Sequence, residues 1–221
     1  MEKQTEKRSA PIKISMVGPL LLSMLLWAFT ATGQSDLTQY DAPQEYQDDW
    51  RFVVLSENDS VAYYGAAQAS RRMLYETLGW GWPTSKQTLE SHTDTIQFHV
   101  QQHNEGAAYT YVILEPQHRQ LRGALFISRV QNRSDVPGFD PAEYQFEITF
   151  WLNEAGQSAQ HSNRLVANIA QWVREEWDVE SVLFPTSRAN IFARNQFEQN
   201  NFEMVAEDAS SNELLYRFRA R

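Results

Sequence analysis

The chain has 221 residues, of which 42% are hydrophobic and 13% aromatic, a composition that suits one globular domain with a leader. Its net charge is −9, and without the first 33 residues, which hold four Lys or Arg and two Glu, the charge becomes −11. This acidic body disfavours nucleic acid and anionic membrane surfaces as partners, and the lack of cysteine excludes disulfides, thiolate catalysis and cysteine metal ligands.

Residues 1–33 have the three-part pattern of a signal peptide. Four basic residues up to Lys13 precede a largely apolar run over 14–32, and Ala31 and Gly33 are the small residues before a cut at Gln34. A cleaved leader predicts export to the periplasm. The run is also near the length of a membrane span, so an uncleaved signal anchor stays open, with membrane contact through 14–32 alone. If the segment is instead an unstructured extension or follows a wrongly chosen start codon, the protein is cytoplasmic.

The rest of the chain predicts a polar linker over 34–49 and one domain over 50–221. Apolar periodicity and turn residues divide this domain into helices and strands. Helices are expected over 61–78, 86–104, 161–177 and 189–200. Strands are expected over 52–55, 109–114, 122–130, 144–152, 181–184, 202–205 and 213–218, with a long polar loop over 131–141. This order predicts a mixed α/β (α+β) fold with a central mixed sheet flanked by helices.

The second half of the chain resembles the GNAT acetyltransferase superfamily. In that family a strand like Glu-Ile-Gly-Tyr-Trp-Val is followed by a loop Arg/Gln-x-x-Gly-x-Gly/Ala and a last helix Asn-x-x-Ala-x-x-Leu-Tyr-Glu-Lys-Leu-Gly-Phe. Here the strand begins at Glu147, and the last helix keeps Asn190, Ala193 and Phe202 in register. Phe197 replaces the family's Tyr, and Asn201 replaces its Gly. The resemblance implies the acyl-CoA N-acyltransferase fold over about residues 50–219.

The first half is similar to a bacterial GNAT-like subgroup. The matching features are Trp82-Pro83 after the first helix, His99 and His103 on the second helix, and the strand that begins Tyr109-Thr110. The subgroup has no well-defined substrate, so this second resemblance supports the fold and adds no acceptor.

The resemblance implies acetyl-CoA as co-substrate. In the family, main-chain groups of the strand that here ends in Trp151 and Leu152 pair with the pantetheine arm, and the following helix start binds the pyrophosphate. Gln157 keeps the first motif position, whereas Gln160 and Ser162 replace the two small residues. Ser162 is compatible with a phosphate, and Asn190 matches a position that contacts the cofactor. The alternative is an ordinary helix start with polar caps.

Glu147 is the candidate general base, since the resemblance places it on the strand that carries this group in the family. A carboxylate there deprotonates an amine directly or through water. The alternative is a carboxylate that only anchors a loop. Phe197 cannot donate the proton that the family's Tyr gives to the leaving thiolate, although it fills the same volume.

Three histidines, His92, His99 and His103, share one face of the second predicted helix. The 99/103 spacing occurs in zinc helices, but no Glu follows His99 and no third ligand is evident, so we predict a solvated polar face and no metal. Tryptophans at five positions are expected to pack the core or line a pocket: Trp80, Trp82, Trp151, Trp172 and Trp177.

Two functions follow from these patterns. The first is an N-acetyltransferase that moves an acyl group from acyl-CoA to a small-molecule amine or a protein N-terminus. The second is a non-catalytic, exported GNAT-like module that binds a ligand or partner through the same cleft. A third arrangement tethers the enzyme to the membrane through 14–32. Whether the protein is an enzyme is therefore left open by the sequence.

Overall fold

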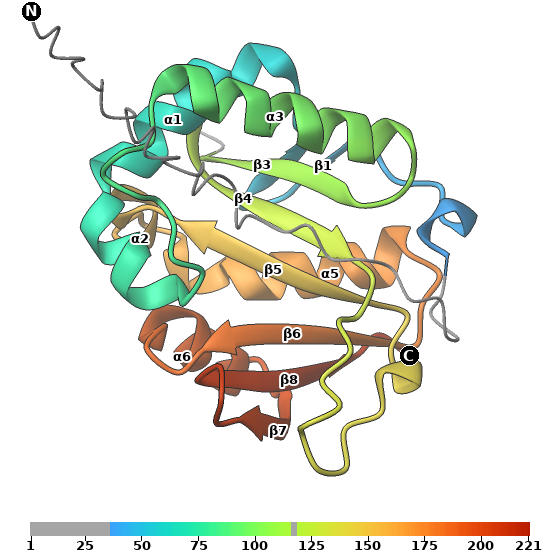
Figure 1. Ribbon diagram of the computed structural model, residues 1–221. Coiled ribbons are helices and arrows are strands. Elements are labelled where there is room, and N and C mark those ends of the chain that lie inside the picture. Colours follow the sequence, from blue (N-terminus) through green and yellow to red (C-terminus); the bar gives the residue numbers. More distant parts are fainter. Residues whose placement is uncertain (1–35, 116–118) are drawn as a thin grey trace, which may run out of the picture. The chain divides into compact units, whose positions relative to one another are not determined.

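The computed structural model describes residues 36–115 and 119–221 (Figure 1). The predicted leader, residues 1–33, lies outside this part of the chain. Among the described residues, no helix has both the length and the apolar character that a membrane span requires.

One eight-stranded mixed sheet forms the centre of the domain, in the order β1-β2-β3-β4-β5-β6-β8-β7. β5 and β6 are parallel, and the other neighbouring pairs are antiparallel. The sequence-based prediction of a mixed sheet is therefore confirmed. The strands are β1 (Glu45–Gln47), β2 (Arg51–Val54), β3 (Tyr109–Glu115), β4 (Gln120–Ser128), β5 (Phe146–Leu152), β6 (Ser181–Ser187), β7 (Glu203–Asp208) and β8 (Glu213–Arg219).

Helices cover both faces of this sheet (Figure 1). One face carries α1 (Ser60–Ala69), α2 (Arg71–Leu78) and α3 (Leu89–Asn104), and the other carries α5 (Leu165–Glu176) and α6 (Ile191–Gln199). The short α4 (Glu154–Gln157) follows β5 directly. Single 3-10 turns lie at η1 (Leu37–Gln39), η2 (Glu57–Asp59), η3 (Pro141–Glu143) and η4 (Ser162–Arg164).

Alternation along β5 divides the core in two. Phe146, Ile148 and Phe150 point to the α5 side, whereas Trp151 belongs to the cluster under α1–α3. The α5 side is rich in aromatic rings, and Trp172 on α5 is fully buried there. Of the five tryptophans that we expected to pack the core or line a pocket, four are buried, whereas Trp80 is 42% exposed.

Three elements differ from the sequence-based expectation. Residues 36–49, expected as a linker, carry η1 and β1, which pairs with β2, and Leu37 is fully buried. The helix expected over 61–78 breaks at Ser70, whose buried hydroxyl accepts a hydrogen bond from the Glu154 amide at 2.8 Å. β6 continues through Pro185 to Ser187, although proline usually ends a central strand.

Close contact between β4 and β5 requires glycine at position 123, where a Cβ atom would collide with the main-chain carbonyl of Trp151. We expect Gly123→Ala to lower the free energy of unfolding by about 1–3 kcal/mol, because main-chain atoms cannot give way as a side chain can. Gly65→Ala is the matched control, since no atom lies within 4 Å of a Cβ at this helical site. It should stabilise the domain by about 0.5–1 kcal/mol. Urea unfolding measures both, and a Gly123→Ala protein as stable as the parent would contradict the contact.

Candidate functional site

The two parallel strands separate after a short contact. β5 pairs with β6 at only two positions, Phe146 with Val182 and Glu147 with Leu183. All seven residues of β6 pair with β8 on its other side. A notch therefore opens between β5 and β6 in the middle of the sheet, toward the carboxyl ends of both strands.

Pro185 explains where the parallel pairing ends. The Arg188 amide donates to the Asn212 carbonyl at 3.0 Å, so even-numbered residues of β6 direct their main-chain groups to β8 and odd-numbered ones to β5. If the ladder continued, the main-chain N–H of residue 185 would be the next to donate to β5, at the Ile148 carbonyl. Proline has no N–H, and its ring occupies that side of the strand. The ladder stops there, and proline is tolerated in a central strand because it pairs only with Leu215 of β8 and with no residue of β5.

Main-chain groups of β5 point into the notch. The Asn153 amide donates to the Arg122 carbonyl at 2.7 Å, so the even-numbered residues of β5 face β6. Phe150 lies beyond the last paired residue, with its N–H and C=O on the open side. The Leu152 carbonyl also lies there and accepts a hydrogen bond from the Gln157 side chain at 3.0 Å. Phe150 is therefore the residue of β5 whose main-chain groups could pair with an added extended chain in the notch.

Trp151 has a different orientation from Leu152. Its main chain pairs with Ala124 of β4, and its side chain lies on the α1–α3 face, where Nε1 donates to the Tyr63 hydroxyl at 3.1 Å. Both groups are buried. Trp151 therefore holds α1 against the sheet, and its indole does not enter the notch.

The segment between β5 and α5 folds into tight turns. Amide groups in this segment, those of Gln157, Ser158, Ala159, Ser162 and Arg164, donate to carbonyls within it. The Val166 amide, in the first turn of α5, donates to the Gln196 side chain at 3.1 Å. Ser162 lies in η4, and Gln160 is exposed rather than directed into the helix start. Many of the amides in this segment thus already have protein acceptors.

An acidic turn between β1 and β2 packs against the same helix start. The Trp50 indole donates to the His161 carbonyl at 2.8 Å, and the Trp50 amide donates to Asn168 at 3.0 Å. This places Asp49 beside the basic groups, with 2.7 Å between its carboxylate and Nε of Arg164. The one arginine of η4 is therefore paired with a carboxylate.

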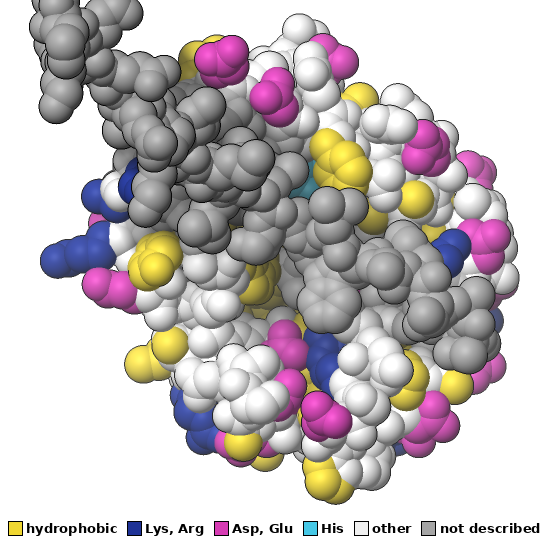
Figure 2. Space-filling view, viewed as in Figure 1, with side chains coloured by type: hydrophobic (Ala, Val, Ile, Leu, Met, Phe, Trp, Pro, Cys, Tyr) yellow, Lys and Arg dark blue, Asp and Glu magenta, His cyan; other side chains and the backbone are white. Residues whose placement is uncertain are grey.

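Glu147 is buried in an ion cluster. Its Oε2 lies 2.9 Å from Nη1 of Arg133 and accepts a hydrogen bond from the Gln131 amide at 3.2 Å. Nε of Arg133 binds Glu213 at 2.8 Å. Glu147 is on β5 and Glu213 on β8, so Arg133 ties together the strands on either side of β6. Acidic and basic side chains lie beside a hollow over this part of the sheet (Figure 2).

Burial raises the pKa of Glu147, while the guanidinium of Arg133 and the two hydrogen bonds oppose that shift. The carboxyl side chain is only 2% exposed. A direct approach of a substrate amine to this carboxylate requires the cover of Arg133 to move, whereas a water molecule needs less space.

Two residues on α6 were singled out by the sequence. Asn190 caps α6, since its side chain accepts a hydrogen bond from the Ala193 amide at 3.1 Å. Phe197 is buried among rings of β5, β6 and the turn after α6, with its centroid 6.1 Å from that of Phe150 and 5.2 Å from that of Phe202. Its ring thus packs beneath the two strands that border the notch.

The predicted solvated face of histidines is wrong. His92 and His103 are buried, and His103 accepts a hydrogen bond from the Thr110 amide at 3.2 Å. Ile96 lies between them at helical spacing and is fully buried, which is the sequence signal that this face of α3 packs on the sheet. Burial lowers the pKa of His92 to about 4. Within the described part of the chain, no group of three or more His, Asp or Glu side chains is arranged to hold a metal ion.

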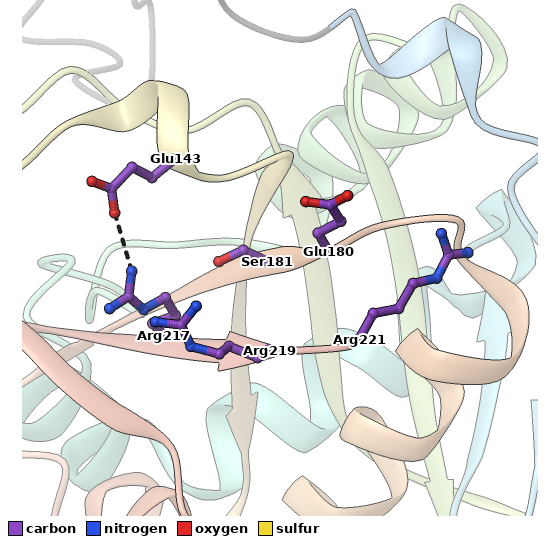
Figure 3. A pocket seen from close by; sticks show the side chains of 6 residues that line it. All are labelled: Glu143, Glu180, Ser181, Arg217, Arg219 and Arg221. Carbon is purple, nitrogen blue, oxygen red and sulfur yellow. Dashed lines mark hydrogen bonds and ion pairs between the residues drawn. The ribbon is translucent and has the colours of Figure 1, made fainter.

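A shallow depression at the other end of β5 and β6 is lined by arginine and glutamate. Its residues are Glu143, Glu180, Ser181, Arg217, Arg219 and Arg221 (Figure 3). Arg217 lies 3.1 Å from Glu143 and 2.9 Å from Glu203, and Arg221 pairs with Asp178. Because carboxylates pair with these guanidinium groups, the depression is part of an ion-pair network at the protein surface.

Solved structures with the same architecture identify the fold. RimL, a ribosomal L7/L12 α-N-protein acetyltransferase, has a TM-score of 0.62 and 15% identity, over 80% of this chain and 92% of its own. The microcin C7 self-immunity acetyltransferase MccE, solved with acetyl-CoA and AMP, has a TM-score of 0.61 and 10% identity over 80% and 97%. A protein from Bordetella pertussis assigned to the GNAT acetyltransferase family has a TM-score of 0.56 and 16% identity over 79% and 99%.

The domain has the GNAT fold. No protein-family model matches the sequence, and no curated protein sequence matches it significantly. The GNAT fold therefore rests on the arrangement of the elements, and the predicted resemblance is confirmed at that level.

Several polar groups around the GNAT notch were not predicted from sequence. Arg133 lies in a long polar loop, and its contact with Glu147 depends on how that loop crosses the sheet. Asp49 lies in the segment expected as a linker. Pro185 carries a signal, because a proline inside an apolar stretch that otherwise continues as a strand marks missing pairing on one side.

Removing the cation from the ion cluster should expose the burial cost of Glu147. We expect Arg133→Met to lower the free energy of unfolding by about 3–5 kcal/mol at pH 7, because one partner of a buried pair is lost. The pKa of Glu147 already lies above its ordinary 4.5 in the folded state and should rise further. A carboxyl group whose pKa is raised by folding stabilises the folded state at pH values below its unfolded pKa. This stabilisation is lost as the pH rises through the folded pKa. The loss should therefore be smaller at pH 5 than at pH 7.

The double variant Arg133→Met, Glu147→Gln is the control. It should regain stability at pH 7 and lose the extra dependence on pH, because no buried carboxyl remains at position 147. Urea unfolding at the two pH values measures each protein. An Arg133→Met protein that is equally destabilised at both would contradict a buried, titrating Glu147.

Proposed function

We propose that this domain binds an acyl-CoA thioester in the notch between β5 and β6 and transfers the acyl group to an amine. The observation that carries the proposal is the end of the parallel ladder at Pro185, which leaves the N–H and C=O of Phe150 directed into the gap. An extended chain with its own amide groups can pair with such an edge, as an added strand does. The pantetheine arm of CoA has two amides and fits this requirement.

The pyrophosphate of CoA would lie at the start of α5. A helix of this length supplies partial positive charge at its N-terminus, and Arg164 is the nearby cation. The turn amides are largely engaged within the protein, and Asp49 holds Arg164. Binding of the diphosphate therefore has to compete with an internal carboxylate, which predicts a modest affinity for CoA.

Glu147 is the proposed general base, acting through water because its side chain is buried. The amine nitrogen attacks the thioester carbonyl carbon, the C–S bond breaks, and CoA leaves as the thiolate while the amine gives up its proton to Glu147. Burial raises the pKa of Glu147, which strengthens it as a base. Phe197 offers no proton to the thiolate. A thiol with a pKa of about 8.5 is a good leaving group as the thiolate, which can take its proton from solvent after it departs, so transfer does not require this acid.

The acceptor is an amine on a small molecule or at a protein N-terminus. This class is taken from the structural neighbours, since RimL is named for a protein α-amino group and MccE for microcin C7 immunity. The proposal also requires the domain to reside where acyl-CoA is present.

Calorimetric titration of acetyl-CoA into the full-length protein tests the donor. We expect saturable binding that Asp49→Asn tightens and Arg164→Gln weakens, each by about 5-fold, because the pair is partly exposed. Glu147→Gln should bind acetyl-CoA like the parent and lose transfer to amines. Transfer is followed by thiol release, which has no background from the chain because it contains no cysteine. Absence of binding in all four proteins would rule out the acyl-CoA enzyme.

A further inference from the structure

Thr149, in the middle of the internal strand β5, is partly exposed to solvent. β5 is an internal strand with helices on both faces, and six of its seven residues are buried, whereas Thr149 is partly exposed. Its neighbours across the pair on β4, Phe126 and Ser128, are partly exposed as well. These three side chains share the face that α1–α3 cover elsewhere. The helical cover is therefore incomplete above the part of β5 where the notch begins, and we call this place the opening.

Aromatic rings form one side of this opening. Phe126 pairs with Thr149 in register, and its ring contacts Trp80 at a centroid distance of 6.0 Å and His99 at 5.4 Å. Trp80 follows α2 and is 42% exposed, so one ring is free to contact a ligand. We call Trp80, His99 and Phe126 the aromatic wall. Burial, and to a lesser extent His92, lower the pKa of His99 to about 4, so the wall is uncharged near neutral pH.

A buried ion cluster with a net negative charge lies beside the opening, and Glu213, whose side chain is 25% exposed, is its most accessible member. Glu147 pairs with Ser128 and is diagonal to Phe126, which puts the two Cβ atoms about 7–8 Å apart. Glu147 and Glu213 share the single cation Arg133, so the cluster has one uncompensated negative charge. Apolar side chains also reach the surface around the hollow on this face (Figure 2). The opening thus combines apolar rings with an anionic group, a combination that suits an ammonium ion on an apolar body.

We propose that the opening above Thr149 binds the acceptor, and that the acceptor is a primary amine with a bulky apolar or aromatic group next to its nitrogen. The apolar group packs against the aromatic wall, and the ammonium lies toward the cluster of Glu147, Arg133 and Glu213. Thr149 lies two residues beyond Glu147, the last residue of β5 that pairs with β6, so the amine faces the thioester across the strand. This inference rests on the proposed function for the role of the amine, but binding of the amine itself does not require acyl-CoA.

Two small amines provide the test. L-Phenylalaninamide and glycinamide carry the same ammonium and amide groups and differ in the aromatic side chain. Their dissociation constants are measured on the full-length protein without acyl-CoA, from chemical-shift changes of the ligands. We expect phenylalaninamide to bind at least about 10-fold more tightly than glycinamide, a ratio that corresponds to burial of part of one ring.

Variants of the wall locate that preference. Trp80→Ala and Phe126→Ala should reduce the ratio to near one. Tyr75→Ala should leave it unchanged, since this exposed aromatic residue on α2 is outside the wall. Trp80 is partly exposed, so its variant is expected to fold even if Phe126→Ala does not.

Equal binding of the two amides, no binding of either, or a preference that survives Trp80→Ala would each overturn the inference. The outcome is separate from that of the donor titration. If acetyl-CoA binds and the amides show no preference, the acceptor inference alone fails. If the amides bind as expected and acetyl-CoA does not, the acyl-CoA function fails and the amine site stands.

Discussion

A missing main-chain donor at Pro185 determines the shape of the centre of this domain. β6 keeps its full ladder with β8, so its position in the sheet is fixed from that side. On the other side the ladder with β5 ends after Leu183, and Phe150 lies beyond its last pair, with main-chain groups directed toward β6. Unpaired polar groups in such a place are costly unless a ligand or water meets them. The interruption of the ladder that forms the notch therefore also favours binding of a ligand with its own amide groups there.

Polar side chains keep the notch open and give it charge. Gln157 satisfies the Leu152 carbonyl at the wide end, and Arg133 joins Glu147 to Glu213 across β6. A buried ion cluster contributes little net stability, since desolvation offsets much of the attraction. The consequence of the cluster is positional, because it holds a carboxylate beside the strand where the proposed thioester would lie. Asp49 would oppose binding of the donor, since it pairs with Arg164, the cation at the proposed place of the pyrophosphate.

Much of the fold was predictable, because apolar periodicity and turn residues are local signals. The order of helices and strands from 50 onward is confirmed, except that the first helix is divided into α1 and α2 and that the short α4 was not predicted. The strand within 34–49 was missed because it is three residues long and polar at both ends. Of the site, Glu147 could be named from its strand position, but its burial and its partner Arg133 depend on a loop of irregular course. His92 was misjudged because a histidine pattern was weighed without the buried Ile96 beside it. The acidic turn at Asp49 is a tertiary contact between distant segments, which no local pattern encodes.

The main-chain amide of Phe150 is the group that tests this account most directly. The chain has 12 phenylalanines, so labelling them with ¹⁵N gives a spectrum in which the Phe150 amide can be assigned by substitution. The account predicts that acetyl-CoA shifts this resonance and slows its exchange with solvent, because a pantetheine carbonyl becomes its hydrogen-bond acceptor. A protein that binds acetyl-CoA while the Phe150 amide keeps its shift and exchange rate would contradict the notch as the binding site.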